Sequence, residues 1–250
     1  MEDSTLSAAL ATVKATSVAI HDIGTAIYLS PETLGRAGEW GWSNPFAFYF
    51  AGRGGMLGDV SADVVYSAFG WFNAGAVTMM YGEGVAVAGA AAAAARMAEA
   101  HALWGEAHLA DVPDLTDVVT VTEELVDALE GSGIPLFVGW RNAERAGSSP
   151  GRLAQLMQIL REWRGGLHLV ATTAVGLTPL EAILTNEGAG QAKFFGWPEP
   201  FPDCAAIKHK HDEAEEMTDR LCAEGLARGL LPDKYPTFEA GVAAVKAALP

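Results

Sequence analysis

The chain has 250 residues, of which 50% are hydrophobic and only 19% are charged, and its formal net charge is −15. This composition excludes a disordered chain, and the length allows a sizeable core without a structural metal or disulfide. An acidic protein of this kind repels nucleic acid phosphates, so we expect no nucleic acid partner. The apolar content favours burial in a large core, a lined pocket or a homodimer interface.

Targeting and membrane segments are not indicated. The N-terminal stretch MEDSTLSAALATVKATSVAI lacks the basic and apolar regions of a secretory signal. The longest small-apolar run, VAVAGAAAAAA at 85–95, is far shorter than the roughly 20 residues that span a bilayer. Cys204 and Cys222 have no zinc-type spacing. We therefore expect a soluble, reduced, cytoplasmic protein without a membrane partner or structural zinc.

Helix starts are indicated where a capping side chain directly precedes proline. The four pairs are Ser30-Pro31, Asn44-Pro45, Ser149-Pro150 and Thr178-Pro179. A side-chain oxygen at the cap, followed by proline at the first helical position, is typical of a helix start. Apolar residues also recur with helical spacing, and no convincing set of strands is present.

These signals predict an all-α fold, a multi-helix orthogonal bundle. Helices are expected over 6–28, 31–39, 45–52, 62–72, 74–81, 85–110, 115–130, 135–145, 150–175, 179–187, 205–229 and 237–248. The stretch RAGSSPG, at 145–151, predicts a boundary between an N-terminal half, 1–147, and a C-terminal half, 148–250, within one compact unit. The stretch GWPEPFP, at 196–202, predicts an irregular loop.

One short motif occurs twice. FAGRGGML around Arg53 and REWRGGLH around Arg164 both carry Arg-Gly-Gly followed by a large apolar residue. A duplicated half-domain explains the repetition, and chance is the alternative because the chain contains 28 glycines.

The apolar stripe of the helix expected over 150–175 passes through Arg164. His168 and Arg161 lie near its edge, and Glu162 is expected on the opposite face. Because an unpaired guanidinium is costly to bury, Arg164 needs a carboxylate, backbone carbonyls or an anionic ligand.

Two hypotheses follow from this cationic stripe. In the first, Arg164 and Arg161 pair with core-facing acids such as Asp63 or Glu181 and hold the two halves together. In the second, they form an anion-binding wall with His168 as a hydrogen-bond partner.

Histidines elsewhere do not predict a metal site. His101 and His108 share one face with Trp104, but two turns, about 10.5 Å, separate them, which is too far for one ion. They are interpreted as ordinary buried histidines, as residues lining a pocket beside Trp104, or as neighbours of His21. The run KHKHDEAEE, at 208–216, offers His209 and His211 with acidic neighbours for metal binding, but a charge run of mixed sign is interpreted as a solvated face.

Several segments resemble an uncharacterised actinobacterial family described as helix-turn-helix-like. The similar features are AIYLSPE, FYFAGRGGMLGDVSADVVYSAFGWFN and the LRE-x-RG-x-x-H element in LREWRGGLH. The resemblance covers roughly 20–230 and implies a duplicated helical fold with winged-helix-like parts and no established activity. This sequence departs from the family at Trp163, where relatives often have histidine, and at Gly166, where they often have aspartate. Its C-terminal winged segment is also shortened.

Three functions are compatible with these patterns. The first is a helical protein with an internal pocket between its two halves, which binds an acidic or aromatic, including haem-like, small molecule. Its expected ligand-binding residues are His21, Arg53, His101, Trp104, Arg164 and His168. The second is a divergent helix-turn-helix transcription regulator. The third is an enzyme in which His168 or His101 performs acid-base chemistry and Arg164 stabilises charge. The sequence specifies neither a cofactor nor catalytic residues.

Overall fold

The fold is all-α, as predicted, in a computed structural model that describes residues 3–250. Its α-helices are α1 (Asp3–Leu29), α2 (Pro31–Glu39), α3 (Pro45–Gly55), α4 (Ala62–Phe69), α5 (Ala74–Ala88), α6 (Ala90–His108), α7 (Leu115–Ala128), α8 (Pro135–Asn142), α9 (Ser149–Ala174), α10 (Pro179–Asn186), α11 (Ala189–Phe194), α12 (Lys208–Gly229) and α13 (Tyr235–Ala247). Two short 3-10 helices, η1 (Ala205–Ile207) and η2 (Pro232–Lys234), precede α12 and α13. Residues 3–250 contain no strand, and therefore no β-hairpin of the kind that forms a wing.

The predicted helix starts are confirmed, with one difference. The side chains of Ser30 and Asn44 accept backbone hydrogen bonds at the starts of α2 and α3. Thr178 forms a complete capping box with Glu181 at the start of α10. Ser148, one residue earlier than predicted, caps α9 without a side-chain hydrogen bond. Proline fits each start because its missing N–H has no partner in a first turn.

The largest differences from the predicted helix boundaries lie between α5 and α6, and one helix was not predicted. Helix α5 continues to Ala88 instead of ending at 81, and the break with α6 falls at Gly89, whose φ is +84°. Gly84 lies inside α5 and does not break it. A Cβ there would lie 2.1 Å from the Ala47 carbonyl oxygen, so glycine is needed for this close approach. Its role is close packing of α5 on α3. Helix α11 is only 6 residues long, too short for a clear period.

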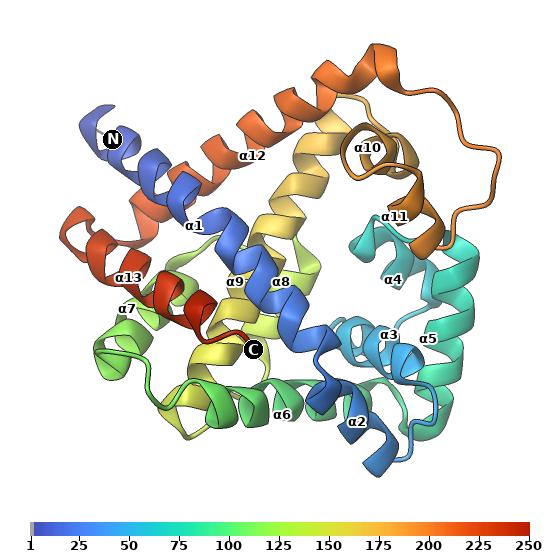
Figure 1. Cartoon of the computed structure of the whole chain (residues 1–250), viewed down its shortest axis with the longest axis horizontal. Helices are drawn as coiled ribbons and strands as arrows, with labels where there is room; N and C mark the ends of the chain where they lie inside the picture. The colour runs from blue at the N-terminus through green and yellow to red at the C-terminus, as the bar shows by residue number, and fades with distance from the viewer. Residues whose placement is uncertain (1–2) are drawn as a thin grey trace.

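Helix α9 occupies the centre of the fold and contacts α1, α6, α7, α8 and α12. Figure 1 shows α13 on one side of α9 and α3, α4 and α5 on the other, while α1 crosses α9, α12 runs across its upper end and α6 runs beneath. Helices α10 and α11 lie above α4, and the predicted loop at 196–202 follows α11. Since α9 has neighbours on most sides, buried side chains occur all around its first four turns. The division into halves at 147 and 148 remains a prediction.

No single helix in residues 3–250 is both long and apolar enough to cross a membrane, although two pairs of helices joined at a sharp bend reach that length and composition together.

Candidate functional site

A cavity of about 1230 Å³ lies between α1 and α9 on one side and α3, α4, α5, α10 and α11 on the other. Aromatic side chains cover much of the wall opposite α9. They are Phe46, Tyr49, Phe50, Phe69, Trp71, Phe72, Phe194 and Phe195. Many of these rings contact one another; the Phe50 and Phe72 centroids, for example, are 4.7 Å apart. The wall therefore offers a broad apolar surface.

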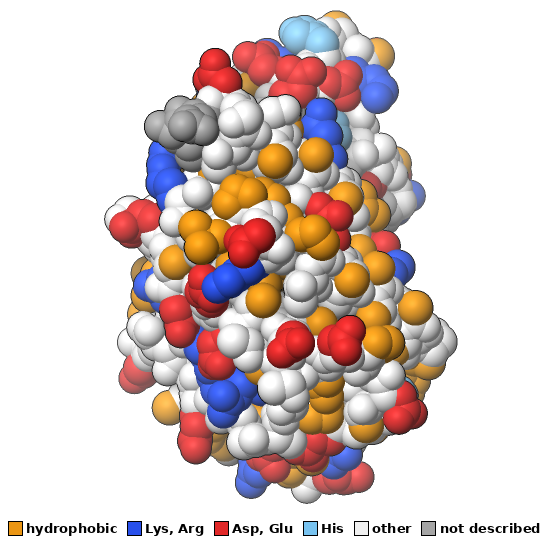
Figure 2. Space-filling view, turned by 90° about the vertical axis from the view of Figure 1, so that its left-hand side faces the viewer, with side chains coloured by type: hydrophobic (Ala, Val, Ile, Leu, Met, Phe, Trp, Pro, Cys, Tyr) orange, Lys and Arg blue, Asp and Glu red, His pale blue; other side chains and the backbone are white. Residues whose placement is uncertain are grey.

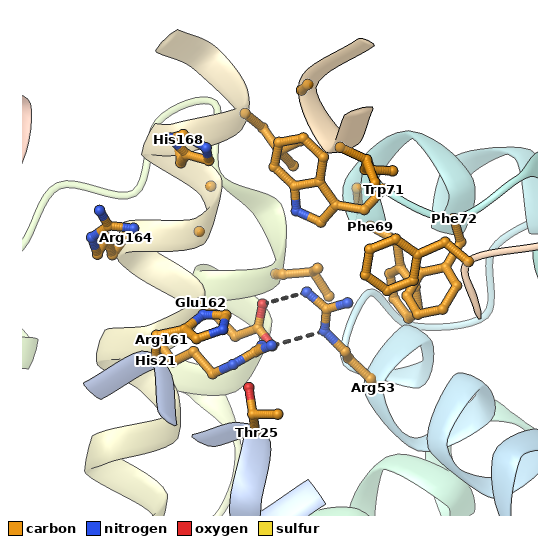
Figure 3. A pocket seen from close by; sticks show the side chains of 18 of the residues that line it. His21, Thr25, Arg53, Phe69, Trp71, Phe72, Arg161, Glu162, Arg164 and His168 are labelled. Atoms are coloured by element: carbon orange, nitrogen blue, oxygen red, sulfur yellow. Dashed lines mark hydrogen bonds and ion pairs between the residues drawn. The ribbon is translucent and has the colours of Figure 1, made fainter. Parts of the chain in front are cut away.

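The wall formed by α9 and α1 is polar (Figure 3). Helix α9 contributes Arg161, Arg164 and His168, which recur every three or four residues and so share one face. Helix α1 contributes His21 and Thr25. An apolar wall thus faces a polar wall, which carries Arg161 and Arg164, across the cavity.

At the base of the polar wall lies a buried network that we call the Glu162 cluster; it consists of Tyr28, Arg53, Gln158, Arg161 and Glu162. Arg53 Nε and Nη2 each donate a hydrogen bond of 2.8 Å to one oxygen of Glu162. The Arg53 guanidinium also lies 4.2 Å from the centre of the Phe69 ring. Gln158 Nε2 and the Tyr28 hydroxyl donate to Glu162 Oε1 at 2.8 and 3.2 Å. Arg53 and Glu162 thus form a closed ion pair.

The pKa values of this pair follow from their contact. Burial alone would raise the pKa of Glu162, but Arg53 and Arg161 outweigh burial and hold it below its usual value. Burial opposes the charge on Arg53 as well, yet Glu162 keeps the Arg53 pKa well above its usual value. Both groups are therefore charged at neutral pH.

Two predictions about α9 are wrong. Glu162 does not lie on a solvated face, because α9 is central and its side chain is 2% exposed. Arg164 and Arg161 pair with Glu215 and Glu162, at 2.7 and 3.4 Å, instead of the suggested Asp63 or Glu181. Asp63 is exposed in the first turn of α4, and Glu181 is used in the capping box of α10.

Arg161 is the incompletely paired cation of the Glu162 cluster. Arg53 already binds both oxygens of Glu162, so the cluster holds two guanidinium groups and one carboxylate. Arg161 Nε and the nearby Thr25 hydroxyl are buried without a hydrogen-bond partner among the described residues. Burial and Arg161 both lower the pKa of His21. The polar wall therefore carries unused hydrogen-bond donors.

Further along the same wall lies a second network, the Glu215 cluster, which consists of Arg164, His168, His211, Glu215 and Thr218. Arg164 Nη2 donates to Glu215 Oε2 at 2.7 Å, and His168 Nδ1 is 2.9 Å from the Thr218 hydroxyl oxygen. Burial, followed by the nearby cations, lowers the pKa of His168 to about 4. His168 is therefore neutral at pH 7. The KHKH run is not wholly a solvated face, because the His211 side chain is only 13% exposed.

Four of the six predicted site residues line the cavity, and two lie elsewhere. Arg53, Arg164, His168 and His21 line the cavity, whereas His101 and Trp104 are not among the residues that line it. His101 is fully buried, its Nδ1 is 2.9 Å from the Met97 carbonyl oxygen, and its ring packs edge-on against Tyr28 and Trp140.

Burial lowers the pKa of His101 to about 4. The Trp104 ring lies against His108, 4.6 Å between centroids, instead of facing the cavity.

Several residues of the site were not proposed from the sequence. Glu162 was excluded by its helical position, and Thr25, His211 and Glu215 were not considered as parts of the cavity. His211 and Glu215 did carry a signal, because residues four apart lie on one helix face. Nothing in the sequence indicates that this face meets His168.

A model described as a helix-turn-helix family matches residues 13–248. The chain belongs to this helix-turn-helix family. The predicted resemblance is thus confirmed at the level of the family, while the actinobacterial origin and the LRE-x-RG-x-x-H element remain predictions. Comparisons of this family member with curated proteins and with solved structures gave no match.

Proposed function

We propose that the chain binds an amphipathic small molecule with an aromatic or polycyclic body and an acidic group. The observation that carries this proposal is a cavity of about 1230 Å³ in which an aromatic wall faces a polar wall with an incompletely paired arginine, Arg161. Ligand sites are typically about 300–1,000 Å³, mainly apolar and fitted with a few polar groups. The cavity exceeds this range, so a ligand of haem-like size fits the proposal.

The acidic group would lie against Arg161. This guanidinium has an unpartnered Nε, and the single carboxylate near it is already bound by Arg53. Thr25 and His21 line the cavity beside it and supply further hydrogen-bonding groups. A carboxylate or sulfonate there would replace costly unsatisfied donors with charge-assisted hydrogen bonds.

A pair of fluorescent probes separates the two parts of this proposal. 8-Anilinonaphthalene-1-sulfonate carries an aromatic body and an anion, whereas N-phenyl-1-naphthylamine has the same body without the anion. We expect Arg161→Gln to weaken binding of the sulfonate by on the order of tenfold, because a charge-assisted hydrogen bond is lost. Binding of the neutral amine should change little. Arg228→Gln, at an exposed residue of α12, is the matched control and should alter neither affinity.

The proposal is wrong if wild-type protein with an intact thermal transition binds neither probe. Equal weakening of both probes by Arg161→Gln would instead indicate a structural role for Arg161. Native mass spectrometry and an absorbance spectrum of the freshly purified protein complement the probes, since a co-purified ligand identifies the natural chemical class directly.

Transcription regulation is the second candidate, and the family match supports it. The net charge of −15 opposes it. Figure 2 views the side of the molecule with α1, α12 and α13, where lysine and arginine are dispersed among acidic side chains. Selection of genomic fragments by the protein tests this function. A bound fragment whose affinity falls steeply with salt would favour regulation over ligand binding alone.

A further inference from the structure

Three potential metal ligands converge at the end of the polar wall. His211 and Glu215 are four residues apart on α12, and His168 faces them from α9. Glu215 Oε1 is 3.6 Å from His168 Nε2 and 3.9 Å from His211 Nε2, and one ligand atom from each residue lies within 4.8 Å of the others. Ligand atoms around a four-coordinate zinc ion stand about 3.4 Å apart, as follows from bonds of about 2.0–2.1 Å. Small side-chain rotations therefore bring the three atoms to ligand spacing.

The hydrogen bond of His168 to Thr218 fixes which imidazole nitrogen faces the cluster. Thr218 donates its hydroxyl proton to the Ala214 carbonyl oxygen at 2.7 Å, so its oxygen accepts from His168 Nδ1–H at 2.9 Å. In the neutral imidazole, Nε2 then carries a lone pair. That lone pair faces a carboxylate oxygen, an arrangement of two acceptors that a bound cation would stabilise. Metal-binding histidines are commonly oriented by such a second hydrogen bond.

Arg164 leaves free the Glu215 oxygen that faces the two histidines. Its Nη2 contacts Oε2 at 2.7 Å, whereas the two histidines face Oε1. Asp219 lies 3.9 Å from the same arginine nitrogen and offsets part of the arginine charge. The guanidinium therefore orients the carboxylate without occupying the side that the imidazoles share.

We propose that His168, His211 and Glu215 bind a divalent first-row transition metal ion, such as Zn²⁺, at the cavity wall. Two imidazole nitrogens and one carboxylate oxygen suit such ions, and a set of three protein ligands leaves a coordination position open. All three residues line the cavity, so that position faces its interior. The inference goes beyond organic ligand binding and does not depend on it, because the metal would bind in the empty cavity.

Titration with Co²⁺ tests this site without any organic ligand. Purified, chelator-treated full-length protein should bind one Co²⁺ per chain and develop visible d–d absorption. Zn²⁺ should then displace the Co²⁺ and remove the absorption. His211→Ala and Glu215→Gln should each weaken Co²⁺ affinity by at least about tenfold. His209→Ala, at an exposed histidine on the same helix, is the matched control and should leave affinity unchanged.

Thr218→Val tests the orienting role of the hydroxyl. The variant keeps the side-chain shape but removes the acceptor for His168 Nδ1–H, so affinity should fall about tenfold or more. Circular dichroism checks that each variant folds. The proposal is overturned if the folded wild-type protein binds no stoichiometric Co²⁺. It is also overturned if binding survives in His211→Ala and Glu215→Gln but disappears in His209→Ala.

Discussion

The Glu162 and Glu215 clusters each pair an arginine with a glutamate, and each pair has one member on α9, Glu162 in the first and Arg164 in the second. They differ in burial: the Arg53 and Glu162 side chains are 8% and 2% exposed, whereas those of Arg164 and Glu215 are 21% and 35% exposed. In the first cluster, the arginine fork closes on both carboxylate oxygens. In the second, one oxygen remains available to other groups. The comparison teaches that burial and geometry, not residue type, determine whether an arginine closes off both oxygens of a carboxylate or leaves one available.

Removing the charge of each glutamate should give very different losses of stability. Glu162→Gln leaves Arg53 buried without a counter-charge, so the free energy of unfolding should fall by about 3–5 kcal/mol. Glu215→Gln should lower it by less than about 1 kcal/mol, because water screens that half-exposed pair. Urea unfolding at neutral pH measures both. Equal losses would contradict the distinction between the two clusters.

The pH dependence of the free energy of unfolding should contain a contribution from one histidine at each cluster. His101 packs on Tyr28 of the Glu162 cluster, is fully buried, and has its pKa lowered from 6.5 to about 4. Between pH 6.5 and 4 the unfolded chain takes up a proton there that the folded chain does not. Stability should therefore fall as the pH falls through this window, by about 3 kcal/mol from His101.

Urea unfolding of His101→Gln at several pH values in this range measures that contribution. The free energy of unfolding should fall less steeply with falling pH than it does in the wild type. His168→Gln is the comparison, since His168 has a pKa of about 4 but lies in the more exposed Glu215 cluster. Because both histidines have a pKa of about 4 in the folded chain, its effect on the slope should be similar. An unchanged slope in His101→Gln would show that other groups dominate acid destabilisation. Above pH 6.5 neither variant should alter the pH dependence, since both histidines are then neutral in both states.

The two glycines between the clusters should respond oppositely to alanine. A Cβ on Gly166 would lie 2.4 Å from Ile134 Cγ2, whereas a Cβ on Gly165 meets nothing within 4 Å. Gly166→Ala should therefore destabilise the fold by about 1–3 kcal/mol through overpacking. Gly165→Ala should stabilise it by up to about 1 kcal/mol, because alanine favours the helix. Thermal unfolding compares the two variants, and the same sign of change in both would contradict this packing.

Substitutions at Gly165 also test the cavity volume without disturbing the fold. It lines the cavity, so leucine at this position should occupy ligand volume while Gly165→Ala leaves most of it free. Binding of N-phenyl-1-naphthylamine should weaken in Gly165→Leu and persist in Gly165→Ala.

Local sequence signals predicted the helices well because caps and prolines act over a few residues. Ser30, Asn44 and Thr178 cap the helices whose starts they predicted. Glycine was less informative, because its effect depends on neighbours. Gly84 lies inside α5 where another backbone approaches, whereas Gly89 breaks the chain direction with a positive φ.

The site was less predictable because its contacts join distant segments. Arg164 was predicted to need a partner, whereas Arg53 was proposed only as a ligand-binding residue, and the acids of Arg53 and Arg164 are 109 and 51 residues away. The position of Glu162 was misjudged because a helical wheel assumes one solvated face, which the central α9 lacks. Tertiary contacts, which periodicity does not encode, decide these pairings.

Helix α1 packs against α12 and α13, and Thr12 and Asp22 of α1 bind Glu239 and Lys246 of α13. Helix α1 is thus held in place by side chains that lie more than 200 residues later in the chain. Such long sequence separations slow folding. The α1 wall of the cavity, with His21 and Thr25, is therefore stabilised by contacts that a growing chain can make only once α13 has emerged from the ribosome.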